Sequence, residues 1–179
     1  MHDWSWQVPF LLGNNFRVIS VDGRCQGKSS APQPTPNINE VVDYHPQSTA
    51  EDVVALLESL GITKNVIIMA HSLGECTGYY IATTRPDLVK ASIGAEAWHL
   101  RRMAQLDKAV PFAQCWGGWG DPEHSLGRRE NAVKAFAGKL KCPRVTFGSN
   151  DWYVATDRDH LPKGDEKLDE IVIIEGKGH

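Results

Sequence analysis

The chain has 179 residues, of which 41% are hydrophobic and 23% charged, and its formal net charge is −3. This length predicts a single domain over residues 1–179, large enough to bury an apolar core without disulfides. Lysine and arginine form no run longer than a pair, so the composition gives no electrostatic footprint for nucleic acid or a membrane surface. We therefore expect neither nucleic acid nor a membrane among its partners.

The cysteines and the apolar segments bear on the cellular setting. The four cysteines show no CxxC spacing, which argues against a zinc site or a redox pair; they are Cys25, Cys76, Cys115 and Cys142. Residues 1–16 lack the basic-then-apolar pattern of a signal peptide. No apolar stretch approaches the ~18 residues that a membrane span needs. We predict a cytoplasmic protein with free thiols.

Short apolar runs alternate with helical patterns along the chain, which predicts an α/β fold with a mostly parallel sheet flanked by helices. The predicted strands are Phe16–Val21, Asn65–Ala70, Leu88–Ala95, Arg144–Gly148 and Glu170–Glu175. The predicted helices are Ser48–Leu60 and Ser72–Thr84. In the first helix, Ser48 and Glu51 have capping-box spacing, and Gly61 stands where a C-terminal cap belongs.

The most informative stretch is residues 66–74, VIIMAHSLG: a buried strand, a small-x-Ser-x-small turn and a helix. Such a turn presents the serine above the sheet, and small residues at Ala70 and Gly74 let its two arms approach each other. Ser72 is thus a candidate nucleophile, with the backbone N–H of Leu73 as an oxyanion donor at the helix N-terminus. The alternative is a serine that only caps the helix.

A serine nucleophile needs a base and an orienting acid. Asp151 follows the predicted strand Arg144–Gly148, and His179 follows the predicted strand Glu170–Glu175. Parallel sheets place their sites at the carboxyl ends of the strands, so both side chains are expected beside Ser72. Glu96 is the alternative acid. The letters HSLG recur at Ser125, but no apolar strand precedes that serine, and we interpret it as part of a loop or helix start.

With these residues in view, the chain resembles the α/β-hydrolase family, in which the triad runs serine, acid, histidine along the chain. Trp6–Pro9 resembles the segment before the family's fourth strand, and Asp22–Ser29 resembles the family's D-x-R-G-x-G-x-S loop. Arg85–Val89 resembles the usual end of the helix that follows the nucleophile. The branch that it resembles most holds epoxide hydrolases, haloalkane dehalogenases, small esterases and C–C hydrolases. The first two use aspartate at the elbow, so Ser72 favours hydrolysis of an ester, thioester, lactone or C–C bond through an acyl-enzyme.

Residues 97–140 are tryptophan-rich and are expected to form a short lid or cap inserted in the domain. The candidate substrate-binding residues are His71, Trp98, Trp116 and Trp119. The tryptophans could line an apolar pocket, or equally pack the lid onto the core. Asp157–His160 is read as a solvated loop and not a cation site. We expect a small-molecule substrate as partner, with no metal and no cofactor; the sequence leaves the oligomeric state open.

The resemblance also implies parts of the fold that the sequence does not contain. The family has further strands before Phe16, one of them normally beside the elbow strand, and a closing helix after its base. The chain is therefore expected to be truncated at both ends, and to be poorly soluble or self-associating when expressed alone. The alternative function is a catalytically weak or inactive hydrolase-like protein that serves at most as a binding scaffold.

Overall fold

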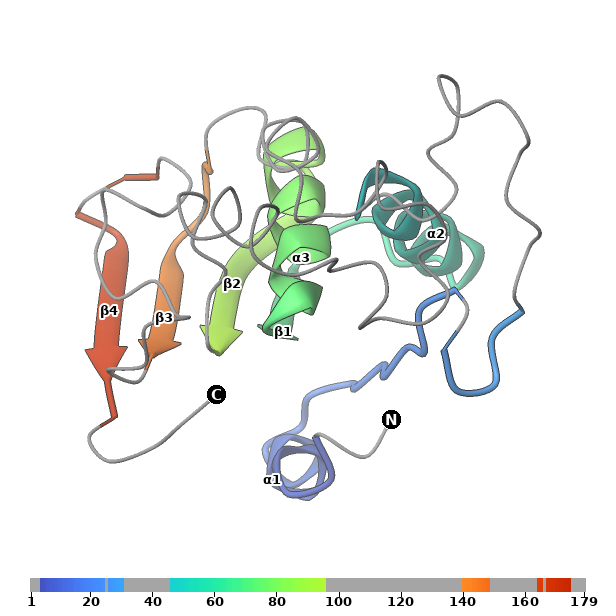
Figure 1. Ribbon diagram of the computed structural model, residues 1–179, viewed down its shortest axis with the longest axis horizontal. Coiled ribbons are helices and arrows are strands. Elements are labelled where there is room, and N and C mark those ends of the chain that lie inside the picture. Colours follow the sequence, from blue (N-terminus) through green and yellow to red (C-terminus); the bar gives the residue numbers. More distant parts are fainter. Residues whose placement is uncertain are drawn as a thin grey trace, which may run out of the picture. The chain divides into compact units, whose positions relative to one another are not determined.

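The computed structural model describes residues 4–24, 26–30, 46–95, 140–148, 164–165 and 167–174. The chain divides into two compact units, Met1–Gln33 and Pro34–His179. The larger unit holds the sheet with its two helices, and the smaller one holds a short helix and a loop (Figure 1).

In its described part, the larger unit has four parallel strands in the order β1-β2-β3-β4. They are β1 (Val66–His71), β2 (Val89–Ala95), β3 (Arg144–Gly148) and β4 (Asp169–Ile173). One row of the register runs Ala70, Gly94, Thr146 and Ile171. The carboxyl ends of all four strands therefore share one edge of the sheet, and Figure 1 shows the arrowheads of β2, β3 and β4 at that edge. The predicted parallel α/β fold is confirmed.

Two helices lie beside this sheet. Helix α3 (Leu73–Thr84) packs on β1 and β2 and against helix α2 (Pro46–Ser59). The buried apolar residues of this unit include Ala50, Leu57, Tyr79, Ile81, Ala82, Leu88, Val89 and Leu140. The contact between α3 and β1 is close, because a Cβ added to Gly78 would lie 3.0 Å from Cγ2 of Ile68. The helix that follows Ser72 is thus seated directly on the sheet.

The two ends of α2 test the predicted caps. Gly61 has a φ of 71°, and the N–H of Ile62 donates to the carbonyl of Leu57 at 2.9 Å. This is the Schellman arrangement, so the predicted C-terminal cap is confirmed. The capping box is wrong: the helix begins at Pro46, whose fixed φ suits the first helical position. Ser48 consequently lies inside the first turn.

The smaller unit differs from the prediction. Helix α1 (Gln7–Gly13) was not predicted. Phe16–Val21 was predicted as a strand, and this is wrong, because the structure gives these residues neither strand nor helix. Their composition favours β structure, but a strand forms only where its backbone pairs with a neighbour, and no ladder among the described residues includes them.

The loop from Asp22 to Ser29 closes on itself through its first residue. The carboxylate of Asp22 accepts the backbone N–H of Lys28 at 3.1 Å, and the Ser29 hydroxyl donates to the Asp22 carbonyl at 2.6 Å. The hydrogen bond from Lys28 lowers the pKa of the Asp22 carboxyl below its ordinary value. The side chain of this aspartate therefore serves to shape the turn.

Candidate active site

Ser72 forms the turn between β1 and α3 in a strained backbone conformation. Its φ of 50° and ψ of −119° lie in the positive-φ half of conformational space, where a non-glycine residue costs about 1–3 kcal/mol. The Ser72 N–H donates to the carbonyl of Ala95 at 2.9 Å, and the Ser72 carbonyl accepts the N–H of Glu75 at 3.0 Å. The turn is thus held to the end of β2 on one side and to the first turn of α3 on the other.

The side chain of Ser72 makes no capping hydrogen bond to α3. A capping role therefore does not account for the serine. Its residue is 4% exposed, which places the hydroxyl in the interior and not on an open surface. Helix α3 begins at Leu73, and the first N–H groups of a helix have no acceptor within it. These groups and the helix dipole can stabilise an anion that forms beside Ser72.

The small residues on either side of the serine matter less for the close approach of strand and helix than the sequence pattern predicts. A Cβ added to Gly74 would lie 3.8 Å from the Cβ of Ala70, an ordinary van der Waals contact. The tight approach between strand and helix occurs one turn later, at Gly78. A side chain at position 74 would therefore fit the turn as the structure has it.

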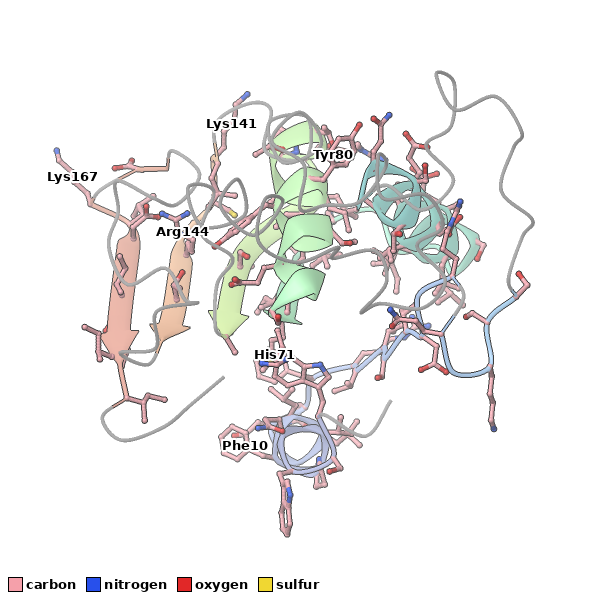
Figure 2. All side chains as sticks on the ribbon, in the orientation of Figure 1. Phe10, His71, Tyr80, Lys141, Arg144 and Lys167 are labelled. Atoms are coloured by element: carbon pink, nitrogen blue, oxygen red, sulfur yellow. The ribbon has the colours of Figure 1, made fainter. Side chains whose placement is uncertain are left out.

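The other predicted site residues are placed only in part. His71 is exposed at the carboxyl end of β1 (Figure 2). Strands β3 and β4 end at the same edge of the sheet as β1, and Asp151 and His179 come after these two strands in the sequence. The predicted residues outside the described part of the chain are Glu96, Trp98, Trp116, Trp119, Ser125, Asp151, Asp157–His160 and His179. The proposed lid over 97–140 also lies outside it, apart from the buried Leu140.

A row of buried polar side chains, which the sequence analysis did not single out, lies between α3 and the sheet. Glu75 and Tyr79 come from α3, Arg144 and Thr146 from β3, and Asp169 from β4. The Arg144 guanidinium donates to the Asp169 carboxylate at 2.5 Å, with the two side chains 1% and 2% exposed. It also lies 5.8 Å from the centroid of the Tyr79 ring. Burial, and next the charge of Glu75, raise the pKa of Tyr79 well above its ordinary value.

One signal for this row was available in the sequence. Arg144 and Thr146 alternate along a strand, and side chains two residues apart point to the same face of a sheet. Two polar residues on one face predict either an exposed face or a buried polar partner. The structure shows the second, and the partners come from a helix and a strand that are distant in sequence.

Comparison with known proteins decides the family. A family model described as the alpha/beta hydrolase fold matches residues 1–120. The chain belongs to the α/β-hydrolase fold family. It is 33% identical over 88 residues to the bifunctional epoxide hydrolase 2 of Sus scrofa. The aligned residues make up 49% of this chain and 15% of that protein. It is 31% identical over 93 residues to an epoxide hydrolase of Caballeronia sordidicola, covering 52% and 26%.

The chain therefore spans well under two thirds of the length of these two relatives of the α/β-hydrolase family. Among solved structures, a monoacylglycerol lipase of Paleococcus ferrophilus superposes with a TM-score of 0.66 at 17% identity, covering 97% of the chain and 79% of the lipase. That likeness supports the fold. Within the described parts of the chain, every helix is too short or too polar to cross a bilayer.

Proposed function

We propose that this α/β-hydrolase is a serine hydrolase that cleaves a small ester, thioester, lactone or C–C bond through an acyl-enzyme. Ser72 is the nucleophile, His179 the base, Asp151 the acid and the Leu73 N–H an oxyanion donor. The observation that carries the proposal is the geometry of Ser72: positive φ, no capping bond, and a place between a parallel strand and a helix N-terminus. A natural protein keeps such strain where it serves a site.

The proposed reaction has two halves. His179 removes the proton of the Ser72 hydroxyl as its oxygen bonds to the substrate carbonyl, and the negative charge on the carbonyl oxygen is held at the Leu73 N–H. His179 then gives the proton to the leaving group as the bond to that group breaks. Water, deprotonated by His179, attacks the acyl-enzyme and releases the acid product, and the proton returns to Ser72. Asp151 orients His179 throughout.

The relatives named as epoxide hydrolases suggest a different substrate, and the nucleophile argues against it. A carboxylate that opens an epoxide gives an ester, which water can hydrolyse. Ser72 would give an ether instead, which resists hydrolysis. The substrate pocket is proposed to involve His71 and the tryptophans of residues 97–140, and the protein is proposed to be cytoplasmic with a small-molecule substrate as its partner.

The proposal is tested with a substrate panel: a p-nitrophenyl ester, an acyl thioester, a homoserine lactone and an epoxide. We expect turnover of at least one of the three acyl substrates and none of the epoxide. The Ser72→Ala variant should lose turnover, and the rate should fall on the acid side through a pKa of about 6–7 as His179 takes a proton. Epoxide opening that persists in the Ser72→Ala variant would refute the proposal.

Two pairs of variants test the remaining assignments. His179→Ala should remove most of the rate while His160→Ala leaves it intact, and equal losses would show that the base is misassigned. Asp151→Asn should cost more than Glu96→Gln, and the reverse order would move the acid to the residue after β2. Substrate binding without turnover in the unmodified protein would favour the scaffold alternative.

A further inference from the structure

We propose that Glu75 is a positioning residue for Ser72, because it belongs to a buried polar row that includes Arg144 and fixes the first two turns of α3 on the sheet. Four members of the row carry the inference: Glu75, Tyr79, Arg144 and Asp169. The inference rests on the proposed function, since it gives these side chains a role through the nucleophile. None of the four touches the reacting atoms in the proposed mechanism.

The first contact of the row is between Glu75 and Gly94. Glu75 is 2% exposed and lies in the first turn of α3. A Cβ added to Gly94 would overlap Oε1 of the Glu75 carboxylate, so the carboxyl group occupies the space that a side chain on β2 would fill. The next residue of β2, Ala95, accepts the N–H of Ser72. Two consecutive residues of β2 thus hold the backbone on both sides of the turn.

The second contact lies one helical turn further along. Tyr79 is four residues after Glu75 and therefore lies on the same face of α3. The Arg144 guanidinium lies over the Tyr79 ring, and it donates a hydrogen bond to the Asp169 carboxylate on β4. Arg144 and Asp169 are register partners at the amino ends of β3 and β4. The row therefore connects the helix that begins after Ser72 to the two strands that precede Asp151 and His179.

Polar contacts can set a position that apolar contacts leave free. Apolar burial is non-directional and depends mainly on the area removed from water. The hydrogen bond between a guanidinium and a carboxylate, as between Arg144 and Asp169, is directional and fixes the relative position of the two groups. The Glu75 carboxyl group likewise fits only in the space beside Gly94. A displacement of about 1 Å at a reacting group can slow a reaction by about 100-fold. A small shift of α3 on the sheet would therefore reach the reaction through Ser72.

The test uses the full chain and compares folding with reactivity. Wild type, Glu75→Ala, Gly94→Ala, the double variant and Glu75→Gln are each measured for thermal midpoint, kcat, KM and the rate of Ser72 labelling by a fluorophosphonate. Ile81→Val is the matched control, since Ile81 is buried on the same helix but lies about 200° around its axis from Tyr79.

We expect Gly94→Ala to lower the melting midpoint and to slow labelling by at least about tenfold, because its methyl group displaces the Glu75 carboxyl. In the double variant that methyl group fills the space the carboxyl has left, so the midpoint recovers while labelling and kcat stay at least about tenfold low. Glu75→Gln keeps the shape of the side chain, and it should label within about threefold of wild type. Ile81→Val should lower the midpoint without slowing labelling.

Each failure has its own signature. If both the melting midpoint and the labelling rate recover in the double variant, the Glu75–Gly94 contact serves packing alone and the inference is overturned. A kcat equal to that of wild type in Glu75→Ala would also overturn it. Glu75→Ala should lower kcat and slow labelling at least about tenfold. If Glu75→Ala does not fold, Glu75→Met keeps most of the side-chain length without the oxygens, and the same loss of kcat and labelling is expected of it. A folded wild type that is not labelled at Ser72 would instead overturn the proposed function, and the inference with it.

Discussion

The buried ion pair between Arg144 and Asp169 predicts a large loss of stability when one partner is removed. Arg144→Met keeps much of the side-chain volume and leaves the Asp169 carboxylate buried without its cation. Both side chains are at most 2% exposed, so water cannot replace the lost charge. Breaking such a pair costs about 3–5 kcal/mol, which corresponds to roughly 6–20 °C in the melting midpoint of a domain this size.

Arg85 provides the control, because its ion pairs with Glu58 and Asp87 lie at the surface. The same change there, Arg85→Met, should leave the free energy of unfolding nearly unchanged, because water screens these surface charges. Both variants are measured by urea unfolding at pH 7 and by a thermal melt. The charge-neutral double variant Arg144→Met/Asp169→Asn should recover much of the loss, since the uncompensated charge is gone. Equal small losses from Arg144→Met and Arg85→Met would refute the burial argument.

Three further predictions concern single residues. Burial raises the pKa of Tyr79, so the neutral phenol contributes stability below about pH 10, and this contribution is lost above that pH. Between pH 9 and 11, Tyr79→Phe should therefore lose less stability than wild type in urea titrations. Equal losses in the two proteins would count against the pKa shift. Gly61 has a φ of 71°, so Gly61→Ala should cost about 1–2 kcal/mol in the same assay, and a neutral result would contradict the cap. Burial also raises the pKa of the Cys142 thiol, so iodoacetamide at pH 8 should alkylate it only after unfolding, as peptide mapping would show.

The strands and helices around Ser72 could be predicted because local sequence determines them. The runs ending at Ala70 and Ala95 are apolar and bounded by turn residues, and the structure places β1 and β2 within a residue or two of the predicted limits. Helix α3 begins one residue later than predicted, because Ser72 itself takes a non-helical conformation. Such elements depend on periodicity and on chain breaks, which a single sequence contains.

The polar row and the smaller unit could not be predicted in the same way. Whether Arg144 is buried depends on Tyr79 of α3 and Asp169 of β4, which contact it and lie 65 residues before it and 25 residues after it in the chain. Phe16–Val21 has the composition of a strand, but pairing with another strand decides whether it forms one. The carboxyl of Glu75 fits only because residue 94 is a glycine. Contacts of this kind depend on packing between distant segments, and no local pattern reports them.

The role of Ser72 as the nucleophile can be tested by mapping a fluorophosphonate adduct on the folded protein by mass spectrometry. We expect one modified serine, Ser72, with labelling abolished by denaturation and by the Ser72→Ala substitution. An adduct on Ser125 with Ser72 unmodified, or a folded and monodisperse protein that shows no adduct at all, would contradict it.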